Sequence, residues 1–291
     1  MDVVKALALC LVAGCGLGMS ADKPWVPIAQ IAPPLTPEVA AAPSALTTTD
    51  HLRIVTYNVA EQIFADPVAI GDVLANDPEL ASASVIFLQE EMALAGQAES
   101  QAQQLADRLG LGYVYAPARD VAGTSDGLAI ASAFPLENVE VMELPFAPSR
   151  LRIALAADVV VGDRRIRIID EHLETFLDAQ QRVRQLHPSV IDAPPATIVA
   201  GDFNTACAEW LATHTPILGG SSATDQAPVI DSYMAALGFA APTADFGVTE
   251  EKYGLACRLD SIYTRGITTG AGGVERIGPS DHWPMWLDIS L

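Results

Sequence analysis

Short apolar runs, each about as long as a β-strand, recur along this chain and limit the folds open to it. They lie at residues 52–59, 84–90, 127–134, 152–161, 165–173, 197–204, 258–264 and 283–291. Helix-like stretches are few, and the clearest are residues 98–110 and 177–186. A doubly wound parallel sheet needs a helix between nearly every pair of strands. The pattern therefore predicts an α+β fold in which two packed, mainly antiparallel sheets are flanked by helices.

The first residues have the three-part layout of a secretory signal. Lys5 precedes an apolar segment over residues 6–13, and small residues follow. The apolar segment is too short to span a membrane, so residues 1–14 are predicted to be a signal peptide that directs export. The letters LVAGC end at Cys15 and resemble a bacterial lipobox, which makes Cys15 the predicted lipidation site. The alternative is that Cys15 is merely a small residue near an ordinary cleavage site.

These features predict an exported protein that is periplasmic, anchored to the outer membrane as a lipoprotein, or secreted. Residues 15–50 are rich in proline and have neither a helical nor a strand period, which indicates an extended tether. The catalytic or binding domain is then predicted over residues 51–291.

The charge balance restricts the substrates. Lys and Arg total 16 against 36 for Asp and Glu, so the formal net charge is -20. Sequence-independent affinity for nucleic acid comes mainly from basic side chains, and this chain has few. A phosphate substrate must therefore meet a local positive charge, which clustered carboxylates can supply by binding a divalent cation.

Polar side chains stand at the ends of most of these predicted strands. They are Asn58, Glu90, His172, Asp202, Asn204, Asp260, Asp281 and His282. Taken alone each is ordinary, since Asp, Gly and Asn in "GDFN" also suit a simple turn. If the strand ends converge, however, the buried acids repel one another unless a cation lies among them. A hard cation with oxygen ligands, Mg²⁺ or Mn²⁺, is the predicted cofactor.

The sequence blocks "TYN", "LQE", "HL", "GDFN", "LDxIY" and "SDH" occur in this order between residues 56 and 282. In kind and order they resemble the blocks of the endonuclease/exonuclease/phosphatase superfamily. Its members include pancreatic-type deoxyribonucleases, abasic-site endonucleases, neutral sphingomyelinases and inositol-polyphosphate phosphatases. The resemblance implies a four-layer αββα sandwich, with the site where loops meet at one edge of the sheets.

The resemblance also implies roles in a metal-dependent phosphoester hydrolase of phosphodiesterase or nuclease type. Glu90 is the implied principal metal ligand, with Asn58 and Asp281 assisting it. Asp202 and Asn204 are the implied positioners of the attacking water and of a phosphate oxygen.

Two histidines complete the implied site, and we expect both on an open rim. His282, paired with Asp260, is implied in proton transfer or transition-state stabilisation, and His172 in donation to the phosphoryl group. Whether Asp202 or His282 takes the proton from water stays open.

Cys207 and Cys257 lie where pancreatic-type deoxyribonucleases carry a disulfide, so the resemblance implies a bridge between them. An exported chain is oxidised in its final compartment, which agrees with that pairing. The alternatives are two reduced buried thiols or, less well supported, a zinc site without a CxxC partner.

The substrate stays open among a nucleic acid, a phospholipid head group and a small phosphodiester. Deoxyribonucleases have a basic residue soon after the "QE" block, whereas this chain has Glu91 and no base before Arg108. A phosphatase or sphingomyelinase-like lipid phosphodiesterase is therefore the alternative to a nuclease. Basic residues do flank the His172 block, as phosphate contacts or as solvated charges: Arg150, Arg152, Arg182 and Arg184. A non-catalytic surface binding protein on the same fold is the alternative outside enzymes.

Overall fold

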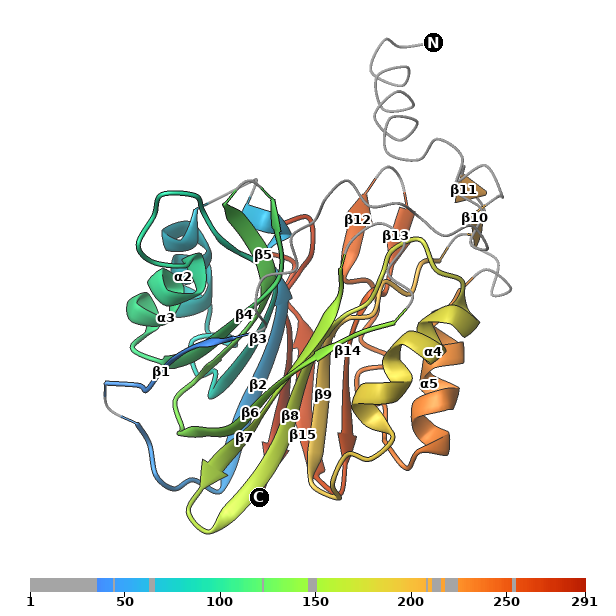
Figure 1. The fold of residues 1–291 in the computed structure, drawn as a ribbon. Coiled ribbons are helices and arrows are strands. Elements are labelled where there is room, and N and C mark those ends of the chain that lie inside the picture. The colour runs from blue at the N-terminus through green and yellow to red at the C-terminus, as the bar shows by residue number, and fades with distance from the viewer. Residues whose placement is uncertain are drawn as a thin grey trace.

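Two β-sheets pack face to face, and helices cover their outer faces (Figure 1). The computed structural model describes residues 36–291 apart from residues 44, 63–65, 122, 146–150, 208, 211–215, 218–224 and 253–254. Both sheets are mainly antiparallel, so the predicted α+β sandwich is confirmed.

The first sheet has seven strands. Their spatial order is β1 (Glu38–Ala40), β4 (Gly112–Val121), β5 (Thr124–Ser132), β3 (Val85–Ala93), β2 (His51–Asn58), β16 (Met285–Ser290) and β15 (Thr268–Val274). Strands β2 and β3 run parallel to each other, and the other neighbouring pairs are antiparallel.

The second sheet has five strands. Their order is β14 (Asp260–Arg265), β9 (Thr197–Asp202), β8 (Arg164–His172), β7 (Ile153–Val161) and β6 (Leu136–Glu143). Here β8 and β9 form the parallel pair. Two short hairpins lie outside the sheets: β10 (Glu209–Trp210) with β11 (Pro216–Ile217), and β12 (Glu250–Lys252) with β13 (Leu255–Cys257).

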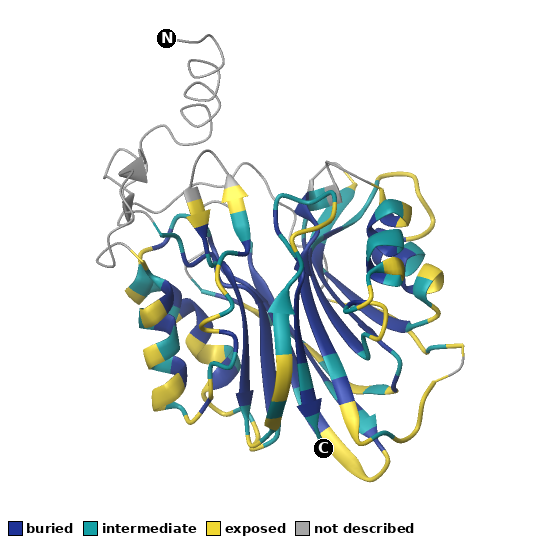
Figure 2. Ribbon diagram, turned by 180° about the vertical axis from the view of Figure 1, so that it is seen from behind, coloured by how far each residue is buried: buried dark blue, intermediate teal, exposed yellow. Residues whose placement is uncertain are grey.

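Alternation along the strands separates three layers of apolar side chains. Ile54, Phe87, Ile168 and Ile198 belong to the layer between the two sheets. Successive strand residues face opposite ways, so the neighbours of these side chains point outward to the helices. Figure 2 shows the result, with buried strands in the middle of the molecule and exposed residues on the outer sides of the helices.

The helices cover one sheet each. The first sheet packs on α2 (Pro67–Asn76) and α3 (Gln101–Leu109), and the second on α4 (Ala179–Val190) and α5 (Ala227–Ala236). Helix α3 ends at Gly110 in the left-handed conformation, as the sequence suggests, and Ser100 caps its start. Helices α2 and α5 are not predicted, because their own sequences are apolar on most sides and show no amphipathic stripe. None of the helices described is long and apolar enough to cross a bilayer.

The predicted tether differs from the structure over its last part. Strand β1 pairs with β4 at the edge of the first sheet, and the Leu46 amide donates to the Ala133 carbonyl at 2.7 Å. Three residues are too few to show a period, and Val39 in β1 is exposed, so no apolar signal marks this strand. The ordered fold therefore begins before His51. The predicted signal peptide and Cys15 lie outside the described residues.

The two parallel pairs lie opposite each other. The amide nitrogen of Asn58, at the end of β2, donates to Asp202 at the end of β9 across 3.0 Å. The carboxyl ends of β2, β3, β8 and β9 therefore open on the same edge of the sandwich, which is where the predicted site residues stand.

Candidate active site

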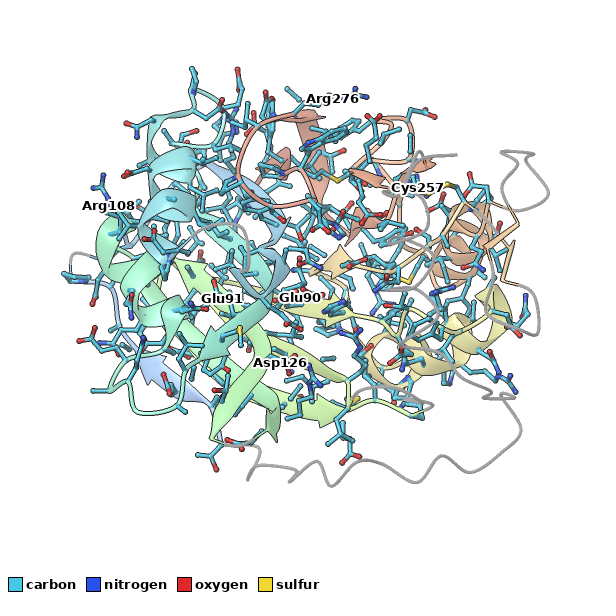
Figure 3. All side chains as sticks on the ribbon, turned by 90° about the horizontal axis from the view of Figure 1, so that it is seen from above. Glu90, Glu91, Arg108, Asp126, Cys257 and Arg276 are labelled. Carbon is cyan, nitrogen blue, oxygen red and sulfur yellow. A yellow bond between two sulfur atoms is a disulfide. The ribbon has the colours of Figure 1, made fainter. Side chains whose placement is uncertain are left out.

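Strand direction brings the predicted side chains to one edge. Asn58, His172 and Asp202 end their strands, whereas Asp260 begins β14, which runs antiparallel to β9 and pairs with Asp202. His282 precedes β16, which runs antiparallel to β2. Each of the three strand-end residues shares its strand face with side chains of the inter-sheet core, because strand faces alternate. Figure 3 looks down on this edge, with Glu90 near its centre.

A β-bulge turns Glu90 toward this edge. The pairing of β3 with β5 shifts between Gln89 and Glu91, and Glu90 itself has φ 61°. A bulge adds one unpaired residue and re-aims the following side chains. Gln89 faces the other sheet, where its amide donates to Asp170 at 2.7 Å, while Glu91 is fully buried beside Tyr115. Glu90 thus lies 3.8 Å from His172, and Glu91 adds no exposed acid there.

Asp202 is the centre of the hydrogen-bond network. One carboxylate oxygen accepts from the backbone of Asn204 at 2.8 Å, and the other accepts from Asn58 at 3.0 Å. That second oxygen lies 3.4 Å from Nε2 of His172 and 3.8 Å from Nε2 of His282. The carboxylate thus meets both imidazoles, and all three side chains are buried.

The backbone around Asp202 is unusual on both sides. Gly201 has φ 142°, and a Cβ there would lie 2.0 Å from the carbonyl oxygen of Glu171. Glycine is therefore required for β8 and β9 to approach this closely. Asn204 also has a positive φ, 49°, and its amide donates to the Leu173 carbonyl at 2.8 Å. Such local strain persists where surrounding contacts hold it, and it concentrates at functional sites.

His282 is held by two groups. Its Nδ1 lies 2.9 Å from Asp260, and its backbone amide donates to the Ser280 hydroxyl, which itself donates to the Asn58 carbonyl. Burial by itself lowers the pKa of His282, but the charges of Asp260, Asp202 and Glu250 outweigh it and leave that pKa well above 6.5. The Asp260 pairing implied by the sequence blocks is therefore present.

The pKa of Asp202 is also raised, but mainly by burial and not by neighbouring charges. Burial raises the pKa of its carboxyl to about 7, against the opposing effect of His282, and the charge of Asp260 raises it further. A base whose pKa lies near the working pH is suited to accept a proton from water.

His172 faces a different kind of partner. Its Nδ1 lies 2.8 Å from Nη1 of Arg152, the residue just before β7. Arg152 also lies 3.7 Å from the buried carboxylate of Glu174. The sequence identifies Arg152 only as a nearby base, and the contact could not be read from it because it depends on the register of β7 with β8.

The expectation of an open rim is wrong for both histidines. His172 is 4% exposed and His282 is 5% exposed. Arg152, Asp202 and Glu90 lie around the His172 ring. Asp260 and Asp202 lie beside the His282 ring.

Of the other arginines that flank the His172 block, Arg182 is buried and Arg184 is exposed. Arg182 is fully buried and donates to the carbonyls of Thr175 and Leu177 and to Gln226, so it shapes the segment after β8. Arg184 is exposed on α4, and Arg150 lies outside the described residues.

Acidic ligands for a cation gather in two overlapping groups. Ligand atoms of Asp202, Asp260 and His282 lie within 4.8 Å of one another, and so do those of Glu250, Asp281 and His282. Oδ1 of Asp260 is buried with no hydrogen-bond partner among the described residues. Carboxylate oxygens are the ligands that Mg²⁺ and Mn²⁺ prefer, so these residues fit a hard divalent cation.

The structure adds one acid to the predicted ligands and gives Asn58 other partners. Glu250 of β12 reaches the site through an isolated bridge to His282, which no local sequence pattern marks. Asn58 uses its amide oxygen to accept from the Ala60 backbone at 2.9 Å and its nitrogen to hold Asp202. Its metal contact, like the ligand roles of Glu90 and Asp281, stays a prediction.

The predicted disulfide between Cys207 and Cys257 is confirmed, with the two Cα atoms 5.4 Å apart. Next to it, the Thr205 hydroxyl donates to the Arg258 carbonyl at 2.6 Å. The bridge therefore ties the segment after Asp202 to the segment before Asp260.

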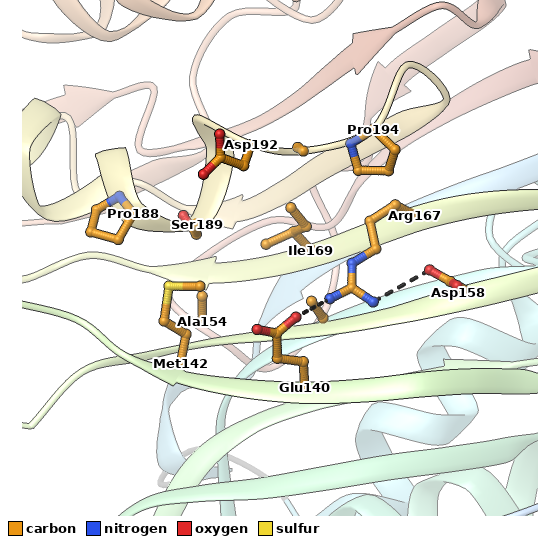
Figure 4. A pocket seen from close by; sticks show the side chains of 12 residues that line it. Glu140, Met142, Ala154, Asp158, Arg167, Ile169, Pro188, Ser189, Asp192 and Pro194 are labelled. Atoms are coloured by element: carbon orange, nitrogen blue, oxygen red, sulfur yellow. Dashed lines mark hydrogen bonds and ion pairs between the residues drawn. The ribbon is translucent and has the colours of Figure 1, made fainter.

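A separate cavity lies on the outer face of the second sheet (Figure 4). It has a volume of about 480 Å³ and is lined by Met142, Ile169 and Pro188, with Arg167 ion-paired to Glu140 at 2.6 Å. None of the candidate catalytic residues lines it, so it does not belong to this site.

Comparisons with known proteins agree with this geometry. The sequence model of the Endonuclease/Exonuclease/phosphatase family matches residues 55–282. A comparison with curated proteins gives no match.

Solved structures share the fold at low identity. An endonuclease/exonuclease/phosphatase from Beutenbergia cavernae is 20% identical with a TM-score of 0.65, over 84% of this chain and 72% of that one. A family protein from Leptotrichia buccalis is 13% identical with a TM-score of 0.63, over 82% of this chain and all (100%) of that one. D. rerio TDP2, complexed with a single-strand DNA product, is 19% identical with a TM-score of 0.58, over 84% and 100%.

The family match covers most of the chain and includes each strand end that carries a candidate residue. The two-sheet sandwich is the fold that these structures share. The chain therefore belongs to the endonuclease/exonuclease/phosphatase family, a family of phosphoester hydrolases.

Proposed function

We propose that this protein hydrolyses phosphoester bonds with the help of a divalent cation. The observation that carries the proposal is the meeting of Asp202 with His172 and His282, at 3.4 and 3.8 Å, at the edge where the two sheets face each other. A carboxylate that can orient water, a carboxylate-paired imidazole and a second imidazole are the groups that such hydrolysis needs.

A bound Mg²⁺ or Mn²⁺ ion would polarise the phosphate as a Lewis acid and offset its charge. Glu90 and Asp281 are the residues proposed to hold it. Asp281 is grouped with Glu250 and His282, whereas Glu90 belongs to neither group and lies 3.8 Å from His172. The chain's own part is to orient water through Asp202 and to hold the developing charge on phosphate oxygens.

We further propose a substrate with little negative charge beyond the scissile phosphate, such as a small phosphodiester or a phospholipid head group. Arg119, near the site edge, is bound to Asp126 at 2.6 Å and lies 3.6 Å from Glu61. Arginines held in this way are not available to neutralise the phosphates of a long polyanion, and the net charge of -20 opposes its approach. Nucleic acid is the second candidate, favoured by the fold shared with D. rerio TDP2, which was crystallised with a single-strand DNA product.

Hydrolysis of bis(p-nitrophenyl) phosphate tests the reaction class. We expect turnover with Mg²⁺ or Mn²⁺ and its loss in excess EDTA, with recovery when metal is restored. The Asp202→Asn variant, purified in parallel, shows whether any residual hydrolysis comes from a contaminant. Full activity in EDTA would overturn the cation requirement. No activity with any metal would favour a binding protein on the same fold.

A panel of duplex DNA, RNA, sphingomyelin, phosphoinositides and inositol phosphates then separates the substrate classes. The proposal expects hydrolysis of sphingomyelin at a rate that changes little with salt, and a preference for the multiply charged phosphoinositides or inositol phosphates would contradict it. Hydrolysis of DNA or RNA, falling steeply as salt rises, would replace it with the nucleic-acid alternative.

We also propose that the protein is exported, because the Cys207–Cys257 bridge is of the kind that persists in oxidising compartments. Mass spectrometry of the mature N-terminus tests the anchor. A diacylated Cys15 supports a lipoprotein, and a free N-terminus elsewhere supports simple secretion.

A further inference from the structure

We propose that Arg152 fixes His172 in one tautomer, with the proton on Nε2, so that His172 presents a hydrogen-bond donor to the phosphoester. Arg152 is thus a positioning residue that acts through His172. The use of that donor rests on the proposed hydrolysis, whereas the tautomer itself does not.

The contact between Arg152 and His172 determines which imidazole nitrogen carries the proton. Nη1 of Arg152 and Nδ1 of His172 are 2.8 Å apart, which is hydrogen-bond distance. A guanidinium group has only donors, so the imidazole nitrogen must accept. A neutral imidazole that accepts at Nδ1 carries its proton on Nε2.

The far side of the ring supports the same assignment. Nε2 of His172 lies 3.4 Å from Asp202 and 3.8 Å from Glu90. Two carboxylates favour an N–H that points toward them and repel a nitrogen lone pair. Both ends of the ring therefore favour the same tautomer, and the contact with Arg152, at 2.8 Å, is the closer of the two.

The fold holds Arg152 in place for this contact. Arg152 is 7% exposed, just before β7, and β7 pairs with β8 so that Ala154 faces Glu171 beside His172. The carboxylate of Glu174, which is completely buried, lies 3.7 Å from Nε of Arg152 and offsets its charge. Gln185 of α4 fixes Glu174 by accepting from its backbone amide at 2.8 Å.

The second histidine has the opposite arrangement. Nδ1 of His282 faces the carboxylate of Asp260 at 2.9 Å, and a carboxylate accepts. His282 therefore holds a proton on Nδ1, which suits a ring that exchanges its other proton. The two imidazoles divide the work: His172 donates to a phosphoryl oxygen, and His282 moves a proton.

The test is a long-range ¹H–¹⁵N correlation spectrum of the full chain labelled with ¹⁵N-histidine and prepared without metal. The chain has five histidines, and the His172→Gln variant identifies the signals of His172 by their loss. In the wild type we expect an unprotonated Nδ1 and a protonated Nε2. Arg152→Lys keeps a cationic donor and should keep this pattern, whereas Arg152→Met should give a mixture of tautomers.

Arg53→Met serves as the matched control, because Arg53 is also ion-paired and poorly exposed but lies in the first sheet beside Asp288. It should leave the His172 signals unchanged. A wild-type ring protonated on Nδ1 would overturn the proposal, and so would an Arg152→Met ring that stays wholly in the Nε2–H form. If Arg152→Met does not fold, a wild-type or Arg152→Lys ring protonated on Nδ1 still overturns the proposal.

Kinetics then test the use of the donor. Arg152→Met should lower kcat by about 10²-fold, the scale of one lost transition-state donor, with a smaller change in KM and partial rescue by Arg152→Lys. A merely structural arginine would lower thermal stability without this selective loss of kcat. If no substrate in the panel is hydrolysed but the tautomer is found, the proposed function fails while the positioning role stands.

Discussion

Asp202 is buried and Asp231 is half-buried, and the two carboxylates have different hydrogen-bond partners. Asp202 is met by amides and by two imidazoles, and burial raises the pKa of its carboxyl to about 7. Asp231 accepts from the Tyr263 hydroxyl at 2.7 Å and from Arg258 at 2.6 Å, a pair of contacts that ties helix α5 to β14. The first arrangement is costly to fold and suited to chemistry, and the second stabilises the fold.

The two environments predict opposite effects of an Asp→Asn substitution on turnover and on stability. Asp202→Asn should lower kcat by at least about 10²-fold while leaving the melting temperature in EDTA unchanged or higher, since a neutral amide avoids the cost of a buried charge. Asp231→Asn should lower the free energy of unfolding by about 1–3 kcal/mol, and with it the melting temperature, while kcat is retained. Calorimetry and steady-state kinetics check both. An Asp202→Asn protein that unfolds early yet retains turnover would make Asp202 a structural residue.

Strand β8 carries acids on both of its faces. Asp170 and His172 point between the sheets, whereas Glu171 shares its face with Ile169 and points toward α4. Burial raises the pKa of Glu171 to about 8, against the opposing effect of the nearby Ser189 hydroxyl. That hydroxyl donates to the Leu186 carbonyl, and neither carboxyl oxygen of Glu171 has a hydrogen-bond partner among the described residues. The folded protein therefore retains on Glu171 a proton that the unfolded chain releases.

This proton makes folding depend on pH. The stabilising effect of protonated Glu171 is complete below pH 4.5 and is lost as the pH rises toward 8. The loss is at most about 5 kcal/mol, and it does not grow further at higher pH. Glu171→Gln should thus melt at a higher temperature than the wild type at pH 8 and lose this advantage at pH 5. Glu143→Gln, on the exposed end of β6, is the control and should follow the wild type at both values. A Glu171→Gln advantage equal at pH 5 and pH 8 would exclude the buried proton.

The strands that carry the site could be predicted because each signal is local: an apolar run followed by a polar residue. The parallel pairing of β2 with β3 and of β8 with β9, which local signals do not give, then brings Asn58 and Asp202 together. Contacts that depend on register between distant segments could not be read, and these include Arg152 with His172 and Glu250 with His282. Strands β4, β6 and β15 also lie outside the predicted apolar runs. The glycine-rich sequence of β15 has little strand character.

In the whole domain, the Cys207–Cys257 bridge joins the segment that follows Asp202 to the segment that precedes Asp260. It closes a loop over a sequence separation of 50, worth roughly 4 kcal/mol in the chain-entropy model. Reduction should therefore lower stability by a few kcal/mol and, by loosening Asp202 against Asp260, lower activity in parallel.

Titration with a reductant, followed by denaturant melts and kinetics, checks this. A Cys207→Ser/Cys257→Ser protein should resemble the reduced wild type and should not respond to reductant. Unchanged activity after complete reduction would show that the bridge protects the fold without shaping the site.

The position of β16 in the first sheet sets an order of events during synthesis. Its neighbour β2 leaves the ribosome early, and the ion pair that joins the two strands, Arg53 with Asp288, spans 235 positions. Until residues 285–290 emerge, the sheet has a gap beside β2, and His282 arrives with the strand that fills it. Nascent chains halted before residue 285 should therefore stay open to protease and devoid of hydrolysis. Under the proposed export and hydrolysis, such a delay would keep the chain unfolded until it is translocated and inactive in the compartment where it is made.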